Sequence, residues 1–131
     1  MLGCFLRVYK TKAFARFARK EDLGDKALAG AISDIERGLI DADMGGGLIK
    51  QRIARSGGGK RGGFRTLIAY HVGKRAVFLF GFAKSDQSNI SPEDERDLKD
   101  YGAMLLALKD KDIDLMTENG ELREVRYDKE N

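Results

Sequence analysis

The sequence predicts an α+β fold: a small antiparallel sheet in the order β-αα-βββ-α, with two N-terminal helices packed on one face and a C-terminal helix nearby. The first observation behind this prediction is a stripe of apolar residues at helical spacing, formed by Leu28, Ile32, Ile35 and Leu39. The second is a series of three alternating segments between residues 48 and 84, joined by short connections. At 131 residues the chain is long enough for one domain with a modest core.

The N-terminal third predicts one strand and two helices. Residues 4–9 (CFLRVY) are apolar and rich in strand-forming types, which predicts a strand. Thr11 is placed to cap a helix that runs to about Arg19, and Asp25 is placed to cap the helix that carries the apolar stripe. Residues 41–47 contain three consecutive glycines, so we expect a connector there.

Three strands are predicted at 48–54, 64–72 and 76–84, and they form an antiparallel meander. Successive side chains of a strand point to opposite faces of its sheet. The positions expected to share a face within each strand are Leu48, Lys50, Arg52 and Ala54; Arg65, Leu67, Ala69 and His71; and Phe78, Phe80, Phe82 and Lys84. We expect Phe78 and Phe80 to pack in the core beneath the two helices.

The C-terminal third begins with a strong helix start at Ser91 and Pro92. Residues 110–118 predict one more short helix. The tail from about residue 117 is polar and expected to be partly loose, although GELREV (120–125) could add a short strand. No repeat or linker divides the chain, so residues 1–131 are predicted to form a single domain.

Charge is distributed unevenly along the chain. Residues 45–84 hold nine cations and no acid, whereas the rest of the chain holds 15 cations and 21 acids. The nine cations are Lys50, Arg52, Arg55, Lys60, Arg61, Arg65, Lys74, Arg75 and Lys84. This bias favours a positive patch that meets a polyanion. The alternative is a sheet edge protected by lysines, but edge protection normally mixes charges of both signs.

The glycine-rich stretch IARSGGGKRGGFRTL (53–67) invites comparison with a phosphate-binding loop of nucleotide-binding proteins. It does not fit that motif, because Ala54 stands where the first glycine is required and Arg61 stands where Ser or Thr is required. Cations on a flexible loop are instead suited to following a nucleic-acid backbone without reading its sequence. Arg55, Lys60 and Arg61 are therefore predicted to contact a nucleic-acid backbone.

Cations on the strands give the more specific signal. Lys50 and Arg52 project from the same side of one strand, and Arg65 and Lys84 come from the next two strands. If these strands are neighbours, the four side chains converge on one surface, where unpaired cations require water or an anion. The alternative is that they pair with acids from the terminal regions.

Composition excludes several classes of site. The single Cys4 allows no internal disulfide and fits a reducing compartment, and the single His71 allows no pair of histidine ligands for a metal. No apolar run approaches the ~20 residues that span a bilayer, and the N-terminus does not read as a secretory signal. We therefore predict a cytoplasmic protein with no membrane contact, no metal and no cofactor.

The stretches GGFRTL (62–67) and FLFGFAK (78–84) are the most specific parts of a resemblance that covers roughly residues 5–110. Over this range the chain resembles the RelE/HigB-type toxins of bacterial type II toxin–antitoxin systems, in the RelE/ParE superfamily. The resemblance implies a RelE-like fold and a metal-independent endoribonuclease that cleaves messenger RNA in the ribosomal A site. In that chemistry the RNA 2′-hydroxyl attacks the adjacent phosphate.

The resemblance also implies catalytic roles for Arg65, Lys84, Lys50 and Arg52. Arg65 matches the phosphate-stabilising arginine, and Lys84 takes the place of a catalytic arginine, which keeps the charge but loses the bidentate fork. Many relatives carry a Tyr or His for proton transfer where this chain has Ile90. Lys84, Lys50 or His71 would then move protons, or the rate would come mainly from induced geometry and charge.

The remaining predictions concern binding and partners. Residues predicted to bind RNA are Arg55, Lys60, Arg61, Phe82, Lys74 and Arg75. The expected partners are messenger RNA, the ribosome and a cognate antitoxin of the helix-turn-helix DNA-binding type, with operator DNA contacted only through the antitoxin complex. Two alternatives stay open: a toxin of the same fold that inhibits gyrase without cleaving RNA, and a nucleic-acid-binding co-repressor.

Overall fold

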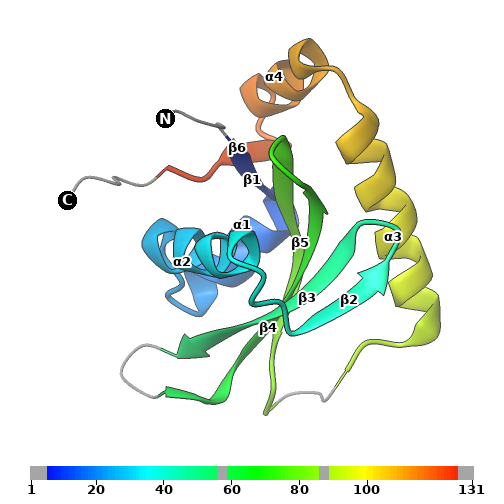
Figure 1. Ribbon diagram of the computed structural model, residues 1–131. Coiled ribbons are helices and arrows are strands. Elements are labelled where there is room, and N and C mark those ends of the chain that lie inside the picture. Colours follow the sequence, from blue (N-terminus) through cyan, green and yellow to red (C-terminus); the bar gives the residue numbers. More distant parts are fainter. Residues whose placement is uncertain (1–5, 56–58, 86–88, 127–131) are drawn as a thin grey trace.

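A six-stranded sheet lies between two layers of helices (Figure 1). The computed structural model describes residues 6–55, 59–85 and 89–126, with the side chains of residues 55 and 59–62 outside the description. In chain order the elements are β1 (Arg7–Thr11), α1 (Lys12–Lys20), α2 (Asp25–Glu36), β2 (Ala42–Gly45), β3 (Leu48–Arg55), β4 (Gly59–His71), β5 (Arg75–Ala83), α3 (Pro92–Ala107), α4 (Asp110–Glu118) and β6 (Leu122–Glu124). The predicted α+β class and the predicted order of elements are confirmed.

The sheet has the strand order β2-β3-β4-β5-β1-β6. Strands β2 to β5 form an antiparallel meander, β1 lies parallel to β5, and β6 is antiparallel to β1. The sheet is therefore mixed, and the prediction of a wholly antiparallel sheet is wrong at the β1–β5 pair. Strand β2 occupies part of the segment expected to be a connector, and Gly45, Gly46 and Gly47 all adopt positive φ in the turn that leads into β3.

One face of the sheet is covered by α1 and α2 (Figure 1). The Thr11 hydroxyl accepts a hydrogen bond from the Phe14 backbone N–H at 3.0 Å and caps α1, as predicted. The cap of α2 is Gly24 rather than Asp25. Leu28, Ile32 and Ile35 of the stripe are buried against this face, whereas the fourth stripe residue lies beyond α2 and is exposed.

The opposite face carries α3, which approaches the sheet closely. The Ser91 hydroxyl accepts a hydrogen bond from the Asp94 N–H at 3.0 Å, so the predicted helix start is confirmed. A Cβ on Gly102 would lie 3.0 Å from the Cβ of Ala69. A side chain at this position would require Ala69 to shift, so glycine favours this close crossing, and α3 covers the part of the face that contains Ala69.

A bulge in β5 changes which of its phenylalanines share a face. The register shifts between Leu67, which pairs with Phe80, and Ile68, which pairs with Phe78. Phe78 consequently packs against Phe14 of α1, with 5.1 Å between ring centroids, while Phe80 and Phe82 lie on the α3 side. The expectation that all three rings share one face, and that Phe80 packs under the N-terminal helices, is wrong for this reason.

The described part of the predicted tail, residues 117–126, forms regular structure. Helix α4 confirms the short helix predicted at 110–118, and β6 confirms the strand that GELREV could add. Leu122 and Val125 are buried, and the backbone N–H of Val125 donates to the carbonyl of Val8 at 2.8 Å.

Candidate nucleic-acid interface

Part of the α3-side face of the sheet carries cations instead of core residues. Across β3, β4 and β5, Lys50 pairs with Leu67 and Leu67 with Phe80 to form one row. Two residues further along, Arg52 pairs with Arg65 and Arg65 with Phe82. The Lys84 backbone N–H bonds to the Gly63 carbonyl at 3.2 Å and begins a third row. Neighbouring rows are about 7 Å apart along the strands.

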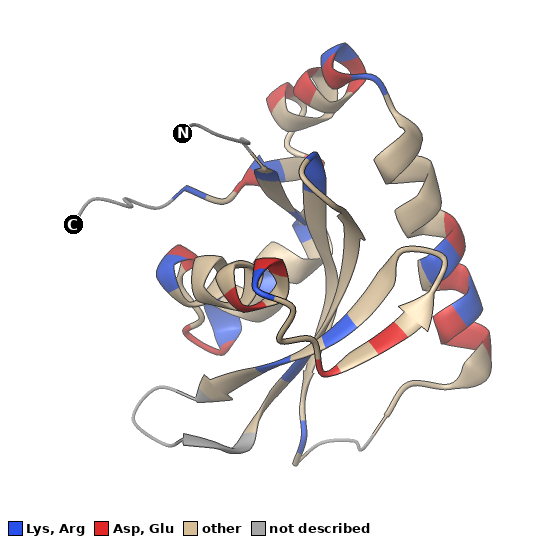
Figure 2. Ribbon diagram, viewed as in Figure 1, with Lys and Arg blue, Asp and Glu red and all other residues tan. Residues whose placement is uncertain are grey.

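We call the surface formed by Lys50, Arg52, Arg65 and Lys84 the cationic face. Figure 2 shows its basic positions on β3, β4 and the end of β5, near one another in the lower part of the sheet. Arg52 and Lys84 are exposed, and Lys50 and Arg65 are half-buried. None of the four side chains forms an ion pair with a carboxylate among the residues that the structure describes. Unpaired cations grouped in this way can hold phosphates.

Two hydrogen bonds lie at the border of the cationic face, one to the Lys50 side chain and one to the Arg52 backbone. The Lys50 ammonium donates to the Asn89 side-chain carbonyl at 3.5 Å, so Asn89, which lies just before α3, is close to β3. The Asp41 carboxylate accepts a hydrogen bond from the Arg52 backbone N–H at 2.5 Å. Strand β2 pairs with β3 only at Leu48–Lys50, so this carboxylate occupies the open edge of β3. Sequence spacing gave no signal for either contact.

Phe82, predicted to bind RNA, is not accessible for that role. Its exposed fraction is 5%, and it packs in the apolar cluster under α3 with Ile90. Phe80, by contrast, is 36% exposed. Phe80, expected to be in the core, is therefore the exposed ring, and Phe82, expected to contact RNA, is the buried one. The bulge in β5, which the sequence did not reveal, accompanies this difference.

Arg75, also predicted to bind RNA, is a structural residue. Its exposed fraction is 2%. Its guanidinium donates to the carbonyls of Leu105 at 2.7 Å and Leu108 at 2.9 Å, and it forms an ion pair with Asp110 at 2.8 Å. Because these contacts hold the end of α3 and the start of α4, the prediction of an RNA contact for Arg75 is wrong.

His71 and Lys74 lie at the other end of the sheet. His71 pairs with Arg75 at the end of β4, six residues from Arg65 and hence about 20 Å away along the strand. Lys74 is exposed in the turn between β4 and β5. Neither side chain is brought to the cationic face. The side chains of Arg55, Lys60 and Arg61, the predicted loop contacts, lie outside the described part of the chain.

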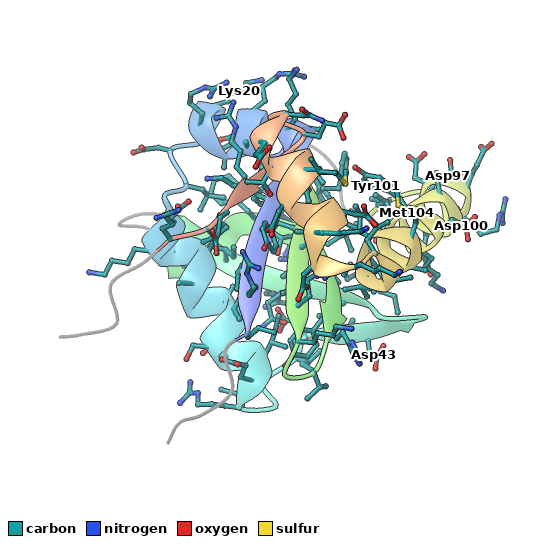
Figure 3. The ribbon with its side chains drawn as sticks, turned by 90° about the horizontal axis from the view of Figure 1, so that it is seen from above. Lys20, Asp43, Asp97, Asp100, Tyr101 and Met104 are labelled. Atoms are coloured by element: carbon teal, nitrogen blue, oxygen red, sulfur yellow. The ribbon has the colours of Figure 1, made fainter. Side chains whose placement is uncertain are left out.

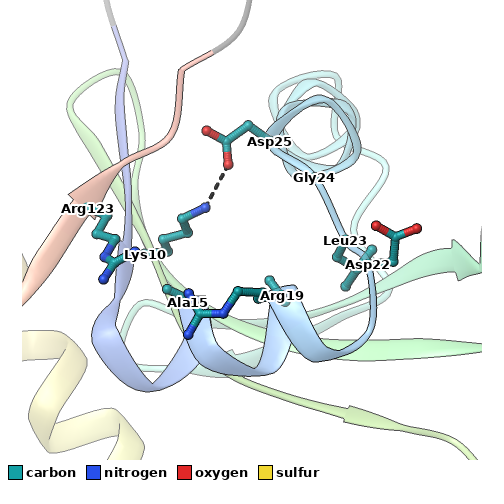
Figure 4. A pocket seen from close by; sticks show the side chains of 9 residues that line it. Lys10, Ala15, Arg19, Asp22, Leu23, Gly24, Asp25 and Arg123 are labelled. Atoms are coloured by element: carbon teal, nitrogen blue, oxygen red, sulfur yellow. Dashed lines mark hydrogen bonds and ion pairs between the residues drawn. The ribbon is translucent and has the colours of Figure 1, made fainter.

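A separate hollow of about 330 Å³ lies on the opposite side of the sheet, between α1 and the start of α2 (Figure 4). Its lining includes Lys10, Arg19 and Arg123 together with Asp22 and Asp25. Lys10 and Asp25 are joined by an ion pair of 2.7 Å, and the second Asp25 oxygen accepts from the Arg126 backbone N–H at 3.0 Å. Here, unlike on the cationic face, charges of both signs compensate one another.

Comparison with protein families shows which family the chain belongs to. The family model described as the RelE toxin of the RelE/RelB toxin–antitoxin system matches residues 6–125. The chain belongs to the RelE toxin family. The resemblance drawn from GGFRTL and FLFGFAK is therefore confirmed. Neither the curated proteins nor the solved structures gave a match.

As a RelE toxin, the protein is the toxin component of a type II toxin–antitoxin system, and its implied partner is a RelB-type antitoxin. None of the helices in the described part of the chain is long and apolar enough to cross a bilayer. Within the same residues, no group of three or more His, Cys, Asp or Glu side chains is arranged to hold a metal ion.

Proposed function

We propose that this RelE toxin is an endoribonuclease that cleaves messenger RNA on the ribosome and so inhibits translation in the cytoplasm. The observation that carries the proposal is the cationic face: Lys50 and Arg52 of β3, Arg65 of β4 and Lys84 directly after β5, with no carboxylate partner among the described residues. The chain belongs to a family of toxins. The cationic face can bind the phosphates of an RNA backbone.

The proposed reaction is an internal transfer of the RNA phosphodiester. The 2′-oxygen attacks the adjacent phosphorus, its proton passes to a base, and the 5′-oxygen of the next nucleotide leaves with a proton. The products are a 2′,3′-cyclic phosphate and a 5′-hydroxyl end. The pentacoordinate intermediate carries more negative charge than the ground state, so fixed cations stabilise it preferentially.

Arg65 is the proposed main phosphate ligand. It lies in the middle strand of the three, with Arg52 opposite on β3, so its guanidinium can bind two non-bridging oxygens while its neighbours hold flanking phosphates. Lys84 or Lys50 is the proposed proton-transfer group. His71 is disfavoured by its distance from Arg65 along β4.

The test is expression of the chain without its antitoxin, followed by mapping of messenger-RNA ends. New ends within translated codons are expected, and Arg65→Ala should reduce them on the order of 10²–10³-fold. Lys74→Ala, which removes a cation at the other end of the sheet, is the matched control. Ends that persist in Arg65→Ala would refute the site. Growth arrest without new ends would favour a toxin that acts on another target, such as gyrase.

The antitoxin is proposed to neutralise the toxin by covering the cationic face or by blocking its entry into the ribosome. The helix-turn-helix class of the antitoxin, and operator binding through the complex alone, remain predictions from the sequence.

A further inference from the structure

A small hollow lies on the same side of the sheet as the cationic face. It measures about 210 Å³ and is lined by Phe80 of β5 and by Asp94, Asp97 and Leu98 of α3. Drug-sized ligands occupy pockets of about 300–1,000 Å³, so this hollow suits one planar ring system. We call it the Phe80 hollow.

The lining of the Phe80 hollow combines apolar side chains with carboxylates, which accept hydrogen bonds. The ring of Phe80 and the side chain of Leu98 supply the apolar surface, and the two aspartates supply carboxylate oxygens. Ion pairs of α3 use other residues: Lys99 binds Glu95 at 3.2 Å. In the described part of the structure, neither Asp94 nor Asp97 has a side-chain ion pair. The hollow therefore suits a flat, apolar ligand whose edge donates hydrogen bonds.

The position of the hollow connects it to the cationic face. Phe80 stands in the same cross-strand row as Lys50, with Leu67 between them. Its ring centroid lies 6.1 Å from that of Phe82, which is the strand partner of Arg65. Phe80 is thus offset from Arg65 by one row, about 7 Å, along the strands and by one strand spacing, about 4.8 Å, across the sheet. This spacing is comparable to the distance between neighbouring nucleotides of an extended RNA strand.

We propose that the Phe80 hollow is a nucleobase subsite for single-stranded RNA, and that it selects bases with donor groups on their edge, guanine foremost. This inference rests on the proposed function, because the cationic face must hold the adjacent phosphates. The base stacks on Phe80, as aromatic side chains do in single-stranded RNA recognition. Guanine presents a ring N–H beside an amino group, and one carboxylate can accept both. Uracil presents carbonyl oxygens on either side of its N–H, which the carboxylates repel.

The arrangement of charge favours a base over a phosphate in this hollow. Glu93, Asp94 and Glu95 occupy the first turn of α3 and would repel the RNA backbone. Phosphates are thereby confined to the strands, and a base edge can reach the carboxylates. A lysine or arginine of the antitoxin could also bind an aromatic ring and two carboxylates. A basic side chain would, however, be repelled by the neighbouring cations, whereas an RNA strand can place a phosphate on the cations and a base in the hollow.

Binding of short, uncleavable RNA tests the subsite separately from nuclease activity. The probes are 2′-O-methyl hexanucleotides of uridine with one central position varied, measured by fluorescence anisotropy with the full-length toxin. Binding should be about tenfold tighter with guanine than with uracil at that position. Phe80→Ala should weaken binding of every probe about tenfold, because stacking does not depend on the base. Asp97→Asn should reduce the guanine-to-uracil ratio towards one.

Asp100→Asn is the matched control. It removes the same charge from the same helix, and Figure 3 shows Asp97 and Asp100 on the same side of the molecule. Asp100 does not line the hollow, so its variant should keep the wild-type ratio. Thermal melting should show that all variants remain folded, since Phe80, Asp97 and Asp100 lie on the surface.

Each outcome decides between the claims. A wild-type toxin that binds the probes with no base preference, or a preference that Asp97→Asn leaves intact, overturns the subsite while leaving the proposed function in place. Failure to bind any probe argues against the cationic face as well. If Phe80→Ala and Asp97→Asn weaken only the complex with the antitoxin, the hollow accepts a basic side chain of that partner and the subsite is overturned. Messenger-RNA ends that shift their base composition in Asp97→Asn support it.

Discussion

Arg52 and Arg65 stand directly opposite each other across β3 and β4, and neither side chain has a carboxylate partner among the described residues. Like charges in this relationship destabilise a sheet. A fold that keeps such a pair at an accessible position sacrifices stability for the ability to bind an anion. This is the physical reason for placing the proposed phosphate site here.

Removing one member of the pair should therefore stabilise the protein. Arg52→Gln is expected to raise the free energy of unfolding by about 0.2–1 kcal/mol at low ionic strength, with the gain shrinking as salt screens the repulsion. Urea denaturation at two salt concentrations measures this. Lys74→Gln is the control, since it removes the same charge from the turn at the other end of the sheet. A loss of stability in Arg52→Gln at low salt would mean that Arg52 has a favourable partner.

Lys84 offers a test of charge against geometry in the proposed reaction. Lys84→Gln should lower the rate of messenger-RNA cleavage by about 10²-fold, because a cation that stabilises the intermediate is lost. Lys84→Arg should retain or raise the rate, since a guanidinium supplies the same charge with a bidentate fork. Single-round cleavage on programmed ribosomes gives both rates. If Lys84→Arg is as inactive as Lys84→Gln, Lys84 acts by moving a proton and not by its charge.

His71 should be dispensable for cleavage. A general base contributes about 10²–10⁴-fold to a rate, so His71→Gln would show a large loss if His71 had this role. We expect no such loss, because His71 lies six residues along β4 from Arg65. A drop of 10²-fold in His71→Gln would place the reaction at the other end of the sheet.

Arg75 should matter for stability. Arg75→Met removes the donors that satisfy the Leu105 and Leu108 carbonyls, and we expect a loss of roughly 2–4 kcal/mol in the free energy of unfolding. Asp110→Asn should cost less than about 1 kcal/mol, because the Asp110 side chain is 72% exposed and its ion pair is screened by water. Denaturant titration compares the two variants. Equal losses would show that the ion pair, and not the carbonyl contacts, holds α3 and α4 together.

Much of this protein could be predicted from local sequence patterns. Alternation of apolar and polar residues in β3 and β4 placed Lys50 and Arg52 on one face and Ile49 and Ile53 on the other, which the burial of the isoleucines confirms. Helix starts at Thr11 and Ser91 were predicted because a cap depends on residues only three positions apart. Family membership was visible in two short motifs of β4 and β5.

Tertiary structure decided the features that depend on distant residues. The β5 bulge moved Phe80 to the α3 side because strand register is set by the pairing of β4 with β5 and not by β5 alone. The same longer-range packing buried Arg75, whose partners lie about thirty residues further along the chain at the junction of α3 and α4. A cation in the sequence has one charge in every context. Whether it meets solvent, a carbonyl or another cation is determined only when the chain folds and brings its neighbours into place.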